Sequence, residues 1–199
     1  MLIENDLGRT VRLVAILNLA YFAVEFGVAL HIGSVSLLAD SVDFLEDAAV
    51  NFLIFAALGW SMRRRARVGM ALAGILLVPA LAFVWALWRK YADPVSPDAI
   101  PLTLTGGGAL IINLFCAFSL ARFRHHSGSL TKAAFLSARN DALANIAIIA
   151  AGLITVFTRS PWPDVVAGVG IAAMNVDAAK AVWTTARDEH RIATKDNRP

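Results

Sequence analysis

The sequence is dominated by apolar stretches of about 20 residues, each long enough to cross a bilayer hydrocarbon core of about 30 Å. Hydrophobic residues make up 58% of the 199 residues, which is above the apolar share of about 45–50% found in soluble domains. We therefore predict an all-α membrane protein, a single six-helix domain over residues 1–199 with no separate soluble domain. The expected spans are 11–31, 36–60, 68–88, 102–123, 133–157 and 165–185.

Lys and Arg residues are distributed unequally between the two sets of linkers. Thirteen fall on one side: Arg9, Arg12, Arg63, Arg64, Arg65, Arg67, Arg122, Arg124, Lys132, Arg187, Arg191, Lys195 and Arg198. The other side holds Arg89, Lys90 and Arg159. Because short cytoplasmic loops carry the excess of Lys and Arg, both termini are expected to be cytoplasmic. This topology accounts for the net charge of +3, so we expect the lipid bilayer and no nucleic acid as a partner.

The second span carries four acids within eight residues, namely Asp40, Asp43, Glu46 and Asp47. A charged side chain at the centre of a bilayer costs about 2.5–3.5 kcal/mol or more, and such residues are usually functional. At about 100° per residue the four acids share about one third of the helix circumference. They can therefore point together into the interior of a bundle.

The fifth span offers a matching polar face, since Ser137, Asp141 and Asn145 follow one another at intervals of four residues. Asp141 lies about 13 Å from the cytoplasmic edge at 1.5 Å per residue. Asp43 lies about 13 Å from the outer edge, on a helix that runs the opposite way. We therefore expect Asp43, Asp47 and Asp141 at about the same depth in the membrane.

Three carboxylates with hydroxyl or amide neighbours make an oxygen-rich cation site. Clustered carboxyl groups retain some of their protons when no cation is bound. A divalent cation displaces those protons, because carboxylates bind metal in the deprotonated form. The pattern thus predicts exchange of a metal ion for protons, and a purely structural polar network between helices remains the alternative.

The stretch "SVSLLADSVDFLED" resembles the second-helix signature of the cation diffusion facilitators. That signature has a small residue, two aliphatics, Ala-Asp, two variable positions, an acid or His, and Asp or Asn four residues later. Asp43 and Asp47 stand at its paired ligand positions. The stretch "FLSARNDALAN" is similar to the second ligand pair and places Asp141 at its carboxylate.

Several properties follow from this resemblance. Family members export divalent transition metals in exchange for protons and commonly act as homodimers that alternate between inward- and outward-facing states. The resemblance implies zinc, cobalt or cadmium as transported substrate, with no cofactor and no enzymatic activity. Ser137 replaces the usual His or Asp, so Ser137, Asn145 or water would complete the ligand set. An all-oxygen set favours harder ions, which keeps iron and manganese open as substrates.

Typical members continue into a cytoplasmic domain, whereas only a short tail follows Thr185. We therefore expect a homodimer that forms through the membrane helices, located in the cell membrane as a multi-pass protein and, in a bacterium, in the inner membrane. The alternative function is a non-transporting metal-binding, structural or regulatory subunit. An intramembrane enzyme has little support, since no nucleophile–base pair lies within a span.

Four further residues are given less weight. Glu25 and Asp40 are expected at similar heights in the outer half, as an exit path, a proton relay or a cap on a neighbouring helix. Glu46 is expected to face Arg139 or the cytoplasmic cavity as part of a proton path, and a direct ligand role is the alternative. Cys116 is the only cysteine, which excludes an internal disulfide, and we predict that it is a packing residue.

Overall fold

The computed structural model describes residues 2–57, 81–121 and 128–174, and within these ranges all regular structure is helical. The four long helices are α1 (Leu2–Ile32), α2 (Val35–Ala57), α4 (Ala99–Ala121) and α5 (Gly128–Thr158). Two shorter helical segments cover residues 81–92 and Trp162–Met174. The prediction of a helical protein is confirmed for the described residues.

Among the described residues, three helical stretches are long and apolar enough to cross a membrane: Gly8–Ile32, Ala99–Ala121 and Asn140–Thr158. They coincide with the first, fourth and fifth expected spans. α2 is a helix of 23 residues at the place of the second, although its acids keep it out of this apolar group. Most of the third expected span and the end of the sixth lie outside the described residues.

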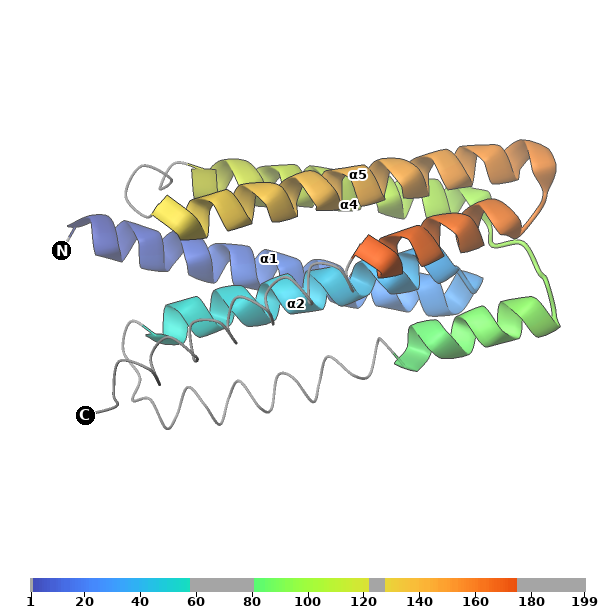
Figure 1. Ribbon diagram of the computed structural model, residues 1–199, viewed down its shortest axis with the longest axis horizontal. Coiled ribbons are helices and arrows are strands. Elements are labelled where there is room, and N and C mark those ends of the chain that lie inside the picture. The colour runs from blue at the N-terminus through green and yellow to red at the C-terminus, as the bar shows by residue number, and fades with distance from the viewer. Residues whose placement is uncertain (1, 58–80, 122–127, 175–199) are drawn as a thin grey trace, which may run out of the picture.

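The long helices form two antiparallel pairs, α1 with α2 and α4 with α5, and α1 also packs against α4 (Figure 1). The Trp162–Met174 helix lies beside α2. Buried apolar side chains from these helices form a shared core. Its fully or nearly fully buried members are Ala29, Leu37, Leu38, Ala39, Leu102, Ala144, Ile148 and Ile171.

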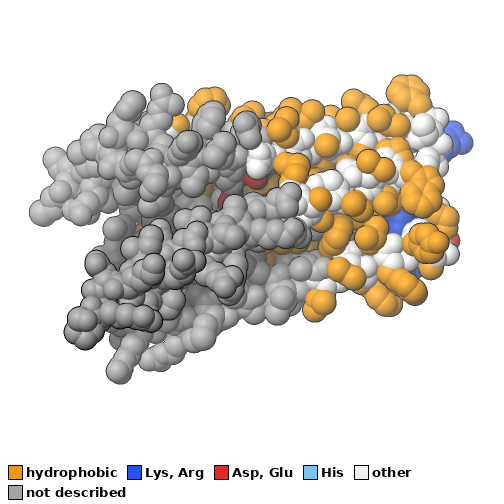
Figure 2. Space-filling view, in the orientation of Figure 1, with side chains coloured by type: hydrophobic (Ala, Val, Ile, Leu, Met, Phe, Trp, Pro, Cys, Tyr) orange, Lys and Arg blue, Asp and Glu red, His pale blue; other side chains and the backbone are white. Residues whose placement is uncertain are grey.

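On the face seen in Figure 2, the described surface of the bundle is strongly apolar. Large side chains such as Leu104, Phe118 and Phe157 are 71%, 73% and 85% exposed. Monomeric soluble proteins rarely expose large contiguous apolar patches, because such patches drive association. On helices of this length the same surface is suited to contact lipid chains, and the buried polar residues described below face the other way.

α1 and α2 are joined by a tight turn in which Gly33 has a φ of 65°, a conformation that costs glycine little. Ser34 then caps α2, and its hydroxyl oxygen accepts a hydrogen bond from the Leu37 N–H at 3.1 Å. The turn and the cap together explain how the chain reverses direction within two residues.

A second cap on α2 comes from Asp164, a fully buried residue in the first turn of the Trp162–Met174 helix. Its carboxylate accepts hydrogen bonds from the Ser34 and Ser36 hydroxyls, each at 2.6 Å. It also accepts from the backbone N–H groups of Val35 at 2.7 Å and Ser36 at 3.1 Å. A negative charge is favourable at a helix N-terminus. We call Ser34, Ser36 and Asp164 the serine–aspartate joint.

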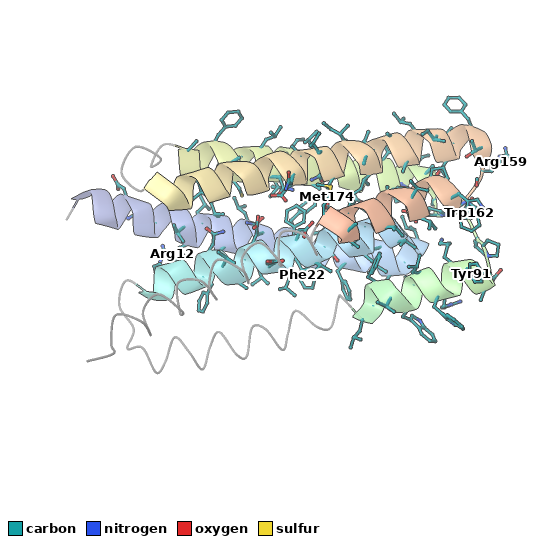
Figure 3. The ribbon with its side chains drawn as sticks, viewed as in Figure 1. Arg12, Phe22, Tyr91, Arg159, Trp162 and Met174 are labelled. Carbon is teal, nitrogen blue, oxygen red and sulfur yellow. The ribbon has the colours of Figure 1, made fainter. Side chains whose placement is uncertain are left out.

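Lys90 lies near this joint and is itself buried. Its ammonium group donates a hydrogen bond to the Val95 carbonyl oxygen at 2.6 Å. Burial lowers the pKa of Lys90 below its ordinary value, and the Asp164 carboxylate acts in the opposite direction. Figure 3 shows Tyr91, Arg159 and Trp162 at this end of the bundle and Arg12 toward the other end.

Candidate functional site

Glu25 of α1 and Asp40 of α2 lie against each other in the interior of the bundle. Both side chains are fully buried, and no donor from the described part of the chain reaches any of their four carboxyl oxygens. The two carboxyl groups are close enough to act on each other electrostatically. Because two carboxylates have no proton donor between them, the pair can form a hydrogen bond only when it holds a proton. The two residues therefore lie side by side across the antiparallel pair of α1 and α2.

Asp43 and Asp47 follow Asp40 along α2, and each is partly buried. The Asp43 charge acts on Glu25, and the Asp47 charge acts on Asp40. Each of the four carboxyl groups is therefore close enough to another one to influence it electrostatically. The backbone carbonyl of Asp47 accepts a hydrogen bond from the side-chain amide of Asn51 at 2.8 Å. α2 thus presents three acids toward the bundle interior over two helical turns.

Glu46 differs from the other three acids of α2 because its side chain is exposed. It still acts electrostatically on its neighbour Asp47. Glu46 therefore lies at the surface, next to the buried carboxyl groups but not among them.

On α5, Asp141 is partly buried and Asn145 is fully buried. The Asn145 side-chain amide donates a hydrogen bond to the Asp141 backbone carbonyl. Its Oδ1 atom has no partner among the described residues. The side chain of Ser137 lies outside the described residues, so its predicted place beside Asp141 stays a prediction.

Cys116 of α4 is a component of this region that the sequence did not indicate. It is 6% exposed, and the charges of both Asp47 and Asp141 act on its thiol. The residue therefore lies near acids from α2 and from α5. In an apolar helix a cysteine is indistinguishable from any small hydrophobic residue by pattern, which is why it was predicted to be a packing residue only.

These residues form a chain along the bundle. Its members are Glu25, Asp40, Asp43, Asp47 and Asp141, and we call them the acid chain. Across the described ranges no group of three or more acidic, His or Cys side chains is close enough together to hold a metal ion. The acids from α2 and α5 therefore do not converge on one point in this conformation.

The fold and the acid chain define a multi-pass helical membrane protein with ionisable groups in the interior of its bundle. The sequence matches the cation efflux transmembrane domain over residues 11–188. The chain therefore belongs to the cation efflux family, the cation diffusion facilitators, as its second-helix signature indicated.

The chain is also similar to curated relatives. Zinc transporter ZitB of Pectobacterium atrosepticum is 24% identical over 193 residues, which cover 90% of this chain and 60% of the relative. The ZitB proteins of Yersinia pseudotuberculosis and Yersinia pestis are each 23% identical over 138 residues, which cover 63% of this chain and 44% of the relative. The chain thus spans at most 60% of the length of these relatives.

Proposed function

We propose that this protein exports divalent transition-metal ions across the membrane in exchange for protons. Zinc, cobalt and cadmium are the proposed substrates, and iron and manganese are the harder alternatives for an all-oxygen site. The observation that supports the proposal is the acid chain. Buried carboxyl groups in a membrane bundle are costly and mark ion pathways, and the similarity to zinc transporters favours a metal ion as the cargo.

In this proposal Asp43, Asp47 and Asp141 bind the ion, and Asn145, Ser137 or water completes its shell. Among the described residues no three acidic, His or Cys side chains are gathered in a metal-binding group, so we propose that binding draws the two helix pairs closer together. We propose that this approach is one step of alternating access. A divalent charge supplies the attraction that draws the carboxylates together.

The proton part of the exchange is assigned to Glu25 and Asp40. A shared proton on this pair is available when a cation arrives at Asp43 and Asp47, since metal binding requires carboxylates in the deprotonated form. The electrostatic links along α2 provide the coupling. Glu46, exposed beside Asp47, is assigned to the access side of the pathway and not to the ligand set.

We further propose an arrangement in the membrane. The distribution of Lys and Arg predicts cytoplasmic termini, in the inner membrane if the source is a bacterium. The protein is proposed to work as a homodimer that forms through its membrane helices. The broad apolar surface of the bundle supplies the area for such contacts.

Proteoliposomes test the transport proposal directly, with a metal-sensitive dye inside and a pH-sensitive dye in parallel samples. We expect zinc uptake to drive proton counterflow and to disappear in Asp47→Asn and Asp141→Asn. Glu25→Gln should retain metal binding and lose most of the proton counterflow. Asp98→Asn, at an exposed position before α4, is the control and should transport like the wild type.

The same experiment separates the two functional classes. Saturable binding of zinc, cobalt, cadmium, iron and manganese without flux of any of them would contradict transport. It would favour a metal-binding structural or regulatory subunit. Ser137→His adds a second measurement, because a nitrogen donor should shift the preference toward zinc. An unchanged metal profile would remove Ser137 from the proposed shell.

A further inference from the structure

Asn18 of α1 is fully buried in the bundle interior. Within the described part of the chain, neither its Nδ2 nor its Oδ1 atom has a hydrogen-bond partner. Nearly all buried side-chain amides are hydrogen-bonded, and each exception requires an explanation. A buried amide without a protein partner is available to bind a ligand.

The register of α1 against α2 shows what Asn18 faces. Glu25 and Asp40 lie against each other across this antiparallel pair. Asn18 lies seven residues before Glu25, and Asp47 lies seven residues after Asp40. Seven residues are about two helical turns, or about 10 Å along the axis, and return a side chain to the same face within about 20°.

The ring contact between Tyr21 and Phe44 supports this register, because it lies between the Glu25–Asp40 level and the Asn18–Asp47 level. Their ring centroids are 5.0 Å apart, so α1 and α2 are still paired one turn beyond the Glu25–Asp40 contact. One further turn brings Asn18 opposite Asp47. The fully buried, unpartnered amide therefore faces an acid that belongs to the proposed cation site.

We propose that the Asn18 carboxamide oxygen is a neutral ligand of the divalent cation that Asp47 binds. This proposal rests on the proposed function and adds α1 to a site otherwise built from α2 and α5. A carboxamide oxygen is a common ligand of cations that are coordinated by oxygen atoms. Unlike a carboxylate, it gives up no proton when the ion binds, so Asn18 contributes affinity without contributing to the proton exchange.

This difference provides the test. Zinc or cadmium is titrated calorimetrically into the full chain in lipid nanodiscs, in two buffers of different ionisation enthalpy. The comparison yields both the affinity and the number of protons released for each ion. Asn18→Leu should weaken binding by about tenfold or more, a loss typical of metal-site neighbours, with unchanged proton release. Asp47→Asn should reduce both quantities.

Asn51→Leu is the matched control, since Asn51 is also buried but its amide is already bonded to the Asp47 backbone. It should bind like the wild type, because the Asn51 amide contacts the Asp47 backbone and not the Asp47 carboxylate. Asn18→Asp provides a second variant that retains an oxygen ligand. It should restore binding and add proton release, even if Asn18→Leu folds poorly.

Three outcomes would overturn the proposal. In the first, Asn18→Leu binds like the wild type while Asp47→Asn loses binding, which leaves the proposed function standing. In the second, Asn51→Leu loses as much affinity as Asn18→Leu, which makes the effect one of packing. In the third, the wild type binds no cation, and the proposed function fails together with the role of Asn18.

Discussion

Asp164 accepts a hydrogen bond from the Ser34 hydroxyl at 2.6 Å, across 130 residues of sequence. The bond fixes the start of α2 to the start of the Trp162–Met174 helix. Because the same carboxylate also binds two backbone N–H groups of α2, it is part of the cap of that helix. Any movement of α2 must therefore carry the Trp162–Met174 helix with it at this end or break the joint.

Removal of the Asp164 carboxylate should destabilise the protein. We expect Asp164→Ala to lower the free energy of unfolding by about 1–3 kcal/mol, because buried hydroxyl and N–H donors lose their acceptor. Thermal denaturation in detergent measures the loss. Asp98→Ala is the control, since Asp98 accepts from the Ile100 N–H at an exposed site where water can replace it. Equal losses in the two variants would contradict the central role of the joint.

Two glycines of the Trp162–Met174 helix test the packing beside the joint. A Cβ atom on Gly168 would lie 2.8 Å from the Val35 backbone carbonyl carbon, whereas one on Gly170 would meet nothing within 4 Å. Gly168→Ala should therefore cost about 1–3 kcal/mol of stability through overpacking. Gly170→Ala should be neutral or slightly stabilising. Similar melting temperatures for both variants would count against the close approach.

Lys90 predicts a dependence of stability on pH. Burial lowers its pKa in the folded state, so the unfolded chain binds more protons between that lowered value and about 10.4. Stability should therefore rise with pH across this window. As the pH is raised toward 10, the melting temperature of the wild type should increase relative to that of Lys90→Met, which has no titrating group at position 90. Parallel curves for the two proteins would contradict the prediction.

Cys116 reports on the cation site without any engineered label, because it is the only cysteine. Its burial predicts slow reaction with a maleimide. Cys116 lies near acids of both α2 and α5, so the proposed approach of these helices on zinc binding should shield the thiol and slow the reaction further, and magnesium should not. Mass spectrometry of the time course measures both rates. Protection that persists in Asp141→Asn would show that zinc acts elsewhere.

The orientation of the protein can be measured by cysteine labelling in a Cys116→Ser background. Asp98 and Asp6 are both exposed, before α4 and near the start of α1. A membrane-impermeant maleimide should label Asp98→Cys in intact cells and Asp6→Cys only after lysis, if the termini are cytoplasmic. The reverse pattern would contradict the topology predicted from Lys and Arg.

Sequence patterns were sufficient for the helices and for the inward face of α2. The apolar lengths located the long helices, and the spacing of Asp40, Asp43 and Asp47 located a polar face. Simple depth arithmetic also placed Glu25 near Asp40. These features depend on one helix at a time or on the height of two residues, which the rise per residue supplies.

Features that depend on lateral packing could not be predicted in this way. Nothing in the stretch around Asp164 indicates a partner at Ser34, and Cys116 looks like a packing residue in its apolar helix. Asn18 becomes informative only once the register of α1 against α2 is known. For the same reason, the equal depth predicted for Asp43, Asp47 and Asp141 did not determine whether they meet in this conformation.

The apolar stretch of α1 is longer than a bilayer core is thick. Gly8–Ile32 has 25 residues, which correspond to about 37 Å of helix, whereas the hydrocarbon core is about 30 Å thick. The helix must therefore tilt or protrude. A thicker or thinner bilayer should change this tilt. Because α1 is packed against α2, which carries the acids, lipid composition becomes a variable of the proposed transport cycle.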